Sequence, residues 1–280
     1  MGINAGSIKV LLREMGDNKE PDGRLLTLGR QDVLVTAKEL EDIFAKFGRK
    51  VLVGSEIPVV SSKPEYSALN YITDKYLYSA LGFKEFRSLD ASEYENADYV
   101  FDLNEPVTPQ NQCNSWDVIF DGGTIEHVFH LPNALANIFR MLKVGGKIIH
   151  IAPSSNHIDH GFYMFSPTLF WDYYNANNYE VNVCEVFCYR SENLYGEGGW
   201  EVSDYVPGAL TRVSLGGLDD GIYGVIMVAT KTTGSTCDII PQQGLYADKK
   251  WQNREQGGAM VSHNPRFRGK GLGLRVKSRL

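Results

Sequence analysis

The chain has 280 residues, of which 43% are hydrophobic and 22% charged, a composition typical of one large globular domain or two small ones. No apolar run reaches the roughly 18 residues that a bilayer span needs, and the first residues lack the apolar stretch of a secretory signal. Four unevenly spread cysteines do not form a disulfide framework. We therefore expect a cytoplasmic protein with no membrane-spanning segment.

Charge is distributed unevenly along the chain. Residues 249–280 carry nine Lys or Arg and one acid, which leaves 19 basic and 33 acidic residues in 1–248, a net charge of −14. A basic, glycine-rich tail of this kind could hold nucleic acid or an acidic partner. Its lack of any core-forming periodicity instead favours a solvated, flexible arm.

Short apolar runs alternate with helical patterns, which is typical of an α/β fold. Strands are predicted at 24–29, 86–92, 97–104, 116–123, 147–153, 179–189 and 223–231. Helices are predicted at 35–48, 71–83, 132–147 and 167–179. The pattern is clearest at 132–147, where Pro132 suits the first turn and Gly145-Gly146 the end.

The first four predicted strands each run into a glycine or an acidic residue. Gly29 follows the first, Asp90 and Asp102 follow the next two, and Asp121-Gly122-Gly123 close the fourth. In an open parallel sheet, ligands bind outside the carboxyl ends of the strands, so these residues would face a ligand. Asp90 could accept hydrogen bonds from a ribose diol, and Asp102 from an exocyclic amine. Either Asp alone is more often a turn former, but their order in consecutive strands favours ligand binding.

These residues, together with "WDVIFDGGTIEHV", "NIFRMLKVGGKIIH" and the late strands, resemble the class I S-adenosylmethionine-dependent methyltransferases, in particular a small-molecule or sugar branch. The likeness covers roughly residues 24–231. It implies an α/β fold with a Rossmann-like, seven-stranded, mostly parallel sheet, a reversed last hairpin and helices on both faces. It also implies that S-adenosyl-L-methionine is bound by residues at the strand ends: Gly29, Arg30, Gln31, Asp90, Asp102, Leu103, Asp121 and Gly122.

The first loop departs from the family pattern. The family has a GxGxG-like run there, whereas this chain has "TLGRQDVLVT" with Gly29 alone. Either Arg30 or Gln31 holds the cofactor's carboxylate in a modified loop, which we expect, or the cofactor site is defective. The second case predicts a non-catalytic cofactor-binding or scaffold protein. A dinucleotide is disfavoured because GxGxxG is absent.

Methyl transfer from a sulfonium depends mainly on alignment of the reacting atoms. An alcohol acceptor must also lose a proton, and an imidazole has a suitable pKa to accept it. His127 and His160 are the candidate catalytic bases, because each follows the carboxyl end of a central predicted strand. The candidate substrate-binding residues lie in the same two loops: Glu126, Asn156, His157 and Tyr163. His150, inside a strand, is expected to be a core histidine.

The sequence permits a divalent metal site but does not favour one. His157, Asp159 and His160, with Asp121 or Glu126, have spacings that permit a His/carboxylate site, but nothing matches a zinc signature. The chain therefore predicts no metal ligands.

The methyl acceptor is bounded only in class. The fourth strand is not followed by the amine-clamping motif of nucleic-acid amino-methyltransferases, and the body is acidic, so nucleic acid is disfavoured despite the basic tail. A loop rich in hydroxyl-binding groups favours O-methylation of a carbohydrate or another small hydroxylated metabolite. The predicted organisation is an N-terminal segment (1–23), a methyltransferase domain (24–248) with insertions at about 54–83 and 190–221 that cover the acceptor, and a flexible tail (249–280).

Overall fold

The computed structural model describes residues 2–15, 23–190, 199–210 and 217–244, and the backbone of residues 278 and 279. The prediction of a flexible tail at 249–280 therefore falls outside the described residues, apart from that last pair. The strands are β1 (Arg24–Leu28), β2 (Glu85–Asp90), β3 (Tyr99–Val100), β4 (Trp116–Asp121), β5 (Leu142–Pro153), β6 (Glu180–Tyr189), β7 (Glu201–Asp204), β8 (Ile222–Thr230) and β9 (Ser278–Arg279). The helices are α1 (Ala5–Glu14), α2 (Ala37–Lys46), α3 (Pro64–Ser67), α4 (Asp74–Ala80), α5 (Leu131–Met141) and α6 (Pro167–Ala176).

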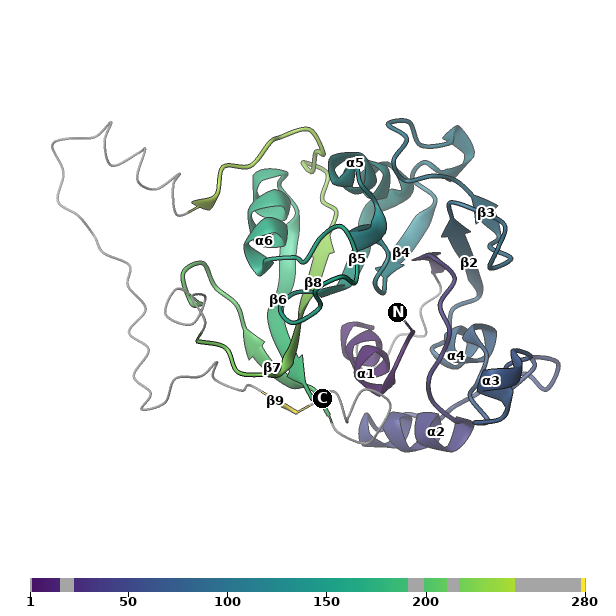
Figure 1. Cartoon of the computed structure of the whole chain (residues 1–280). Coiled ribbons are helices and arrows are strands. Elements are labelled where there is room, and N and C mark those ends of the chain that lie inside the picture. Colours follow the sequence, from purple (N-terminus) through teal and green to yellow (C-terminus); the bar gives the residue numbers. More distant parts are fainter. Residues whose placement is uncertain (1, 16–22, 191–198, 211–216, 245–277, 280) are drawn as a thin grey trace, which may run out of the picture.

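The strands form one Rossmann-like α/β sheet in the order β3-β2-β1-β4-β5-β8-β6-β7-β9 (Figure 1). The first five strands in this order pair parallel, and β8 runs antiparallel to both β5 and β6. The strand order reverses between β1 and β4, which makes the carboxyl ends of these strands a topological switch point, the usual place for a ligand in such sheets.

The sheet differs from the prediction in its number of strands. The described residues form nine strands rather than seven, because β7 and β9 extend the edge beyond β6. Of the expected reversed last hairpin, the two strands β6 and β8 pair antiparallel, and the connection between them includes β7. The described part of the second predicted insertion thus adds a strand to the sheet, where Val202 is fully buried.

Helices cover both faces of the sheet. The apolar side chains of α1, α2 and α4 pack in one cluster with Leu25 of β1, and those of α5 and α6 pack in a second cluster with Leu26. Neighbouring residues of β1 point to opposite faces because side chains alternate along a strand. Figure 1 shows the two helical layers on either side of the sheet.

Local signals account for the helix ends. Thr36 and Glu39 form a reciprocal capping box at the start of α2. The helix predicted at 132–147 ends at Met141, and Leu142 already pairs with Trp116 in the sheet. The Lys231 ammonium group donates hydrogen bonds to the carbonyls of Phe139 and Leu142, at 2.7 and 2.6 Å, and so satisfies the free carbonyls of this helix end.

The N-terminal segment packs against the sheet. Ile3 pairs with Val33, and the Ile3 amide donates to the Asp32 carbonyl at 2.7 Å, next to the β1 loop. Arg13 of α1 makes a two-pronged ion pair with the buried carboxylate of Glu185 on β6, at 3.2 and 2.8 Å. None of the helices in the described part of the chain combines the length and apolar character needed to cross a membrane.

Candidate active site

A cavity of about 850 Å³ lies at the carboxyl ends of β1, β2, β3 and β4. Six of the predicted cofactor residues line it: Gly29, Arg30, Gln31, Asp90, Asp102 and Leu103. The other two, Asp121 and Gly122, stand just behind, and the following residues Gly123 and Thr124 reach the cavity wall instead. His127 lines the same cavity. The strand-end positions chosen from the sequence are therefore brought together in one place.

Gly29 is required by the geometry of the first loop. Its φ is +69°, and a Cβ atom there would lie 2.8 Å from the Thr124 hydroxyl. That hydroxyl donates to the Leu28 carbonyl at 2.6 Å, while the Gly29 amide donates to the Leu89 carbonyl at 2.7 Å. The ends of β1, β2 and β4 are thus held together at the point where the backbone must approach a ligand. Thr124 carries no recognisable sequence signal, so its role is seen only in the structure.

Asp90 and Asp102 both line the cavity and both stabilise their own turns. One oxygen of Asp90 accepts from the Ser92 amide at 3.2 Å, and one oxygen of Asp102 accepts from the Asn104 amide at 2.8 Å. Each carboxylate therefore forms a local turn of the kind common for Asp. Because a carboxylate has about four lone-pair sites, this role still leaves it able to accept further hydrogen bonds from a ligand.

Arg30 and Gln31 stand where the resemblance found in the sequence would predict small residues. The Arg30 guanidinium bonds Asp74 at 3.2 Å and the Asn96 carbonyl at 2.8 Å, so it joins the β1 loop to α4 and to the β2–β3 connection. The Gln31 amide group donates to the Leu28 carbonyl at 3.2 Å, and its buried oxygen has no hydrogen-bond partner among the described residues. Gln31 lines the cavity, but this unused acceptor oxygen is itself buried from solvent.

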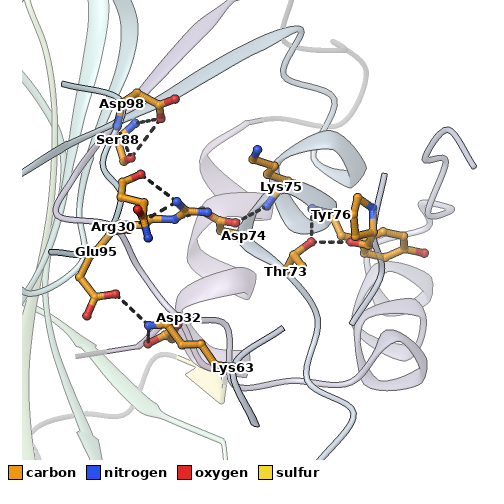
Figure 2. Close-up of polar contacts among 12 residues, drawn as sticks. Arg30, Asp32, Lys63, Thr73, Asp74, Lys75, Tyr76, Ser88, Glu95 and Asp98 are labelled. Atoms are coloured by element: carbon orange, nitrogen blue, oxygen red, sulfur yellow. Dashed lines mark hydrogen bonds and ion pairs between the residues drawn. The ribbon is translucent and has the colours of Figure 1, made fainter. Parts of the chain in front are cut away.

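Lys63, just before α3, connects two sides of the cavity. Its ammonium group lies 2.9 Å from both the Asp32 and the Glu95 carboxylates, as Figure 2 shows. From the segment that Lys63 anchors, Tyr66, Leu69 and Tyr71 line the cavity. The first predicted insertion therefore lies against this cavity. No motif in the sequence marks Lys63 for this role.

The cavity wall is acidic. Among the described lining residues, four carry carboxylates (Asp32, Asp90, Glu95 and Asp102) and one, Arg30, carries a guanidinium. Such a wall attracts a ligand with positive charge and repels a pyrophosphate. S-adenosylmethionine, with its sulfonium and amino groups, suits these charges better than a dinucleotide.

A cluster of three titratable side chains adjoins the cavity. Glu126 and His127 lie in a short 3₁₀ helix directly after the Asp121-Gly122-Gly123 turn, and His160 comes from the loop after β5. An oxygen of Glu126, Oε1, is 3.4 Å from Nε2 of His160 and 3.8 Å from Nε2 of His127. The two imidazole rings have centroids 5.2 Å apart. Both predicted catalytic histidines thus meet at one carboxylate.

Burial distinguishes the three members of this cluster. The Glu126 side chain is 0% exposed, whereas those of His127 and His160 are 48% and 30% exposed. Burial, with a further contribution from Asp121, raises the pKa of Glu126 to about 8. Burial also lowers the pKa of both histidines, and in His160 the neighbouring His127 adds to this effect. Burial therefore favours the neutral form of both imidazoles.

A buried triad supports the turn behind this cluster. His150, fully buried as predicted, lies 2.6 Å from Asp121 through Nδ1 and 2.6 Å from the Tyr174 hydroxyl through Nε2. The other Asp121 oxygen accepts from the amides of Thr124 and Ile125, at 3.0 and 3.3 Å. Asp121 therefore shapes the turn that presents Glu126 and His127, rather than lining the cavity.

The remaining predicted substrate residues differ in their surroundings. The Asn156 amide group donates to the Gly221 carbonyl at 2.6 Å, and the Tyr163 hydroxyl donates to the Phe129 carbonyl at 2.7 Å. Both groups hold the loop in place. His157 stacks edge-on against His160, with ring centroids 5.6 Å apart, and its Nε2 is buried without a hydrogen-bond partner among the described residues.

No protein-family model matches the chain, and no curated protein matches its sequence. Solved structures similar to it include an S-adenosylmethionine-dependent methyltransferase from Aquifex aeolicus, at 12% identity over 80% of this chain and 90% of that one, with a TM-score of 0.38. Another from Thermotoga maritima shows 15% identity over 82% and 90% of the two chains, with a TM-score of 0.38. Geranyl diphosphate C-methyltransferase from Streptomyces coelicolor A3(2) shows 12% identity over 80% and 75%, with a TM-score of 0.39. Likenesses this weak do not establish a function, so the residues of the site must carry it.

Proposed function

We propose that the protein is an S-adenosylmethionine-dependent methyltransferase that methylates a hydroxyl group of a small molecule. The observation that carries this proposal is the position of His127, which belongs both to the acidic cavity at the strand ends and to the Glu126–His127–His160 cluster. A cofactor in the cavity and an acceptor at the cluster would therefore be neighbours. Methyl transfer requires such a juxtaposition.

The cavity residues suit the parts of S-adenosylmethionine in a definite order. Asp90, at the end of β2, would accept hydrogen bonds from the ribose diol, and Asp102 with Leu103 would contact the adenine. Gly29 would let the methionine part approach the backbone beside Gln31. Arg30 is engaged with Asp74, so its proposed role is to hold the loop rather than to bind the carboxylate.

Methyl transfer itself needs no covalent intermediate with the protein. Holding the acceptor oxygen, the methyl carbon and the sulfur in line at about 3–3.5 Å supplies much of the rate. The hydroxyl proton must also leave, and a neutral imidazole can accept it. His127 has the better access because it lines the cavity, and His160 lies beside it. The burial of the cluster is consistent with neutral imidazoles at working pH.

The surroundings of the cluster bound the acceptor. Phe129 and Phe162 are 61% and 66% exposed and form an edge-to-face pair with centroids 5.6 Å apart, in the same two loops as His127 and His160. Exposed aromatic rings beside hydroxyl-binding groups suit a sugar or another small hydroxylated metabolite, whose apolar face can pack on a ring. The acidic cavity disfavours a polyanionic acceptor.

Calorimetric titration of the full chain with S-adenosylmethionine, followed by turnover against pooled sugars and phenols, tests this proposal. We expect one cofactor site and transfer of labelled methyl to at least one hydroxyl compound. Absence of cofactor binding would remove the proposed function. Cofactor binding without transfer to any acceptor would support the alternative of a non-catalytic cofactor-binding or scaffold protein. The unusual Arg30-Gln31 loop is the reason for that alternative.

A further inference from the structure

The Glu126 carboxyl group is buried without a hydrogen bond among the described residues, and its nearest polar neighbours are two imidazoles. Its side chain is 0% exposed, and neither oxygen has a hydrogen-bond partner among the described residues. Nε2 of His160 is likewise buried without a hydrogen bond there. Burying polar groups in this way is costly, and proteins usually offset the cost by pairing the group or by coordinating a metal. Glu126 and His160 therefore have buried ligand atoms that no hydrogen bond among the described residues occupies.

The distances within the cluster match those of a metal site. One oxygen of Glu126 and one ring nitrogen each of His127 and His160 all lie within 4.8 Å of one another. The Glu126 oxygen is 3.4 Å from the His160 nitrogen and 3.8 Å from the His127 nitrogen. Two ligand atoms bound at about 2.0–2.2 Å in tetrahedral geometry are about 3.3–3.6 Å apart. Small side-chain adjustments would thus suffice to coordinate one ion.

Backbone contacts hold the two loops of the cluster together. The Glu126 carbonyl accepts from the amides of Phe162 and Tyr163, at 2.8 and 3.2 Å, just after His160. A Cβ atom on Gly161 would lie 3.1 Å from Cγ of Glu126 and 3.2 Å from Nδ1 of His127, so a larger residue would require these side chains to shift slightly. The three side chains are therefore positioned by contacts outside the cluster, as expected of a preorganised site.

We propose that Glu126, His127 and His160 bind a single divalent cation of the Mn²⁺ or Zn²⁺ type. Two imidazoles and one carboxylate suit such a borderline ion better than Mg²⁺, which prefers oxygen ligands. The set differs from the one considered from sequence, since His157 and Asp159 do not belong to the group whose ligand atoms meet. Three protein ligands leave coordination positions open, as in catalytic metal sites.

The cation has a role in the proposed reaction, and that part of the inference rests on the proposed function. The acceptor hydroxyl would take an open position, where the ion lowers its pKa and its proton leaves to water. The resulting alkoxide forms a bond to the methyl carbon while the carbon–sulfur bond breaks. The products are the methyl ether, S-adenosylhomocysteine and one proton. With the cation bound, both imidazoles serve as ligands, and water accepts the proton that His127 would accept in the cation-free protein.

Binding can be measured without cofactor or acceptor. The full chain, with any affinity tag removed and after treatment with a chelator, is titrated calorimetrically with MnCl₂, ZnCl₂ and MgCl₂. We expect one equivalent of Mn²⁺ or Zn²⁺ to bind more tightly than Mg²⁺, and one equivalent of Co²⁺ to give visible d–d absorption bands. If none of these ions binds the untagged protein, the metal site is wrong.

Ligand variants locate the site. Glu126→Gln, His127→Ala and His160→Ala should each weaken cation binding about tenfold or more, since even partners that only orient ligands commonly contribute that much. His130→Gln, which changes an exposed histidine of the same loop, is the matched control and should bind normally. Glu126→Gln is almost isosteric, and its affinity for S-adenosylmethionine reports whether it has folded. If all three variants bind the cation as tightly as the unaltered protein does, the assignment is wrong.

Activity separates this inference from the proposed function. If the protein binds the cation at these ligands but transfers no methyl group, the proposed function fails and the metal site stands. If methyl transfer continues at full rate after the cation is removed, the catalytic role of the cation is wrong and an imidazole acceptor is favoured. We expect turnover to fall on chelation and to return when Mn²⁺ or Zn²⁺ is added back.

Discussion

The candidate site has two halves, the cavity at the strand ends, which is the proposed cofactor half, and the Glu126–His127–His160 cluster, which is the proposed acceptor half. Their carboxylates differ in burial and in hydrogen bonding. In the cofactor half, Asp90 and Asp102 accept hydrogen bonds from backbone amides two residues further on and remain partly or largely open to solvent. In the acceptor half, Glu126 is fully buried, and its oxygens have no hydrogen-bond partner among the described residues. A carboxylate of the first kind is stable with or without a ligand. A buried carboxyl group without hydrogen bonds, such as that of Glu126, would be stabilised by binding a charged or hydrogen-bonding partner.

The largest effect is expected in the acceptor half. His127→Ala should lower turnover by about a hundredfold or more, because the residue would be lost either as the proton acceptor or as a metal ligand. The affinity for S-adenosylmethionine should change little. Single-turnover rates and cofactor calorimetry on the same preparation measure both quantities, with His130→Gln as the control. A variant that loses cofactor affinity but keeps its rate would place His127 in the cofactor half.

Asp90→Ala tests the cofactor half. A hydrogen bond to a charged group contributes roughly 1.5–3 kcal/mol, so the dissociation constant for S-adenosylmethionine should rise about tenfold or more. Glu93→Ala, an exposed acid just beyond Asp90, is the control and should bind normally. Calorimetry measures both variants. Unchanged affinity in Asp90→Ala would mean that this carboxylate serves its turn alone.

Gly29→Ala tests the close approach of the loop after β1 to Thr124, where both residues line the cavity. Forcing alanine into the left-handed region costs about 1–2 kcal/mol, and here the new Cβ would also lie 2.8 Å from the Thr124 hydroxyl. Gly48 is a matched control, because its φ is +66° and a Cβ there meets nothing within 4 Å. Chemical denaturation should show the greater loss for Gly29→Ala, with weaker cofactor binding only in that variant. Equal losses would leave backbone strain as the only cause.

Lys63→Met should have the smallest effect. Partly exposed ion pairs contribute about 0–1 kcal/mol, so the free energy of unfolding should fall by less than about 1 kcal/mol. The variant breaks the bridge from Lys63 to Asp32 and Glu95 and so releases the segment of Tyr66, Leu69 and Tyr71 that lines the cavity. We expect a measurable rise in the dissociation rate of S-adenosylmethionine in stopped-flow experiments. An unchanged rate would show that this bridge does not hold the cofactor in place.

Much of the fold could be predicted because its signals are local. Alternating apolar runs indicated the central strands, and the glycine and acids at their ends marked the positions that line the cavity, from Gly29 to Asp102. The predicted end of α5 was wrong because an apolar residue such as Leu142 fits the pattern of a buried helix and of a buried strand equally well. Its place was decided by pairing with Trp116 and by Lys231, both distant in sequence.

The sequence alone determined that the chain is an α/β protein whose strand-end residues meet at one edge of a sheet, because the periods of helices and strands are local properties. It also singled out His127 and His160, but it could not join them to a single buried carboxylate. That arrangement depends on the Glu126 carbonyl accepting the amides of Phe162 and Tyr163. Contacts between segments so far apart leave no periodic trace in either one. Only the tertiary structure could therefore decide which polar groups share a partner and which are buried without one.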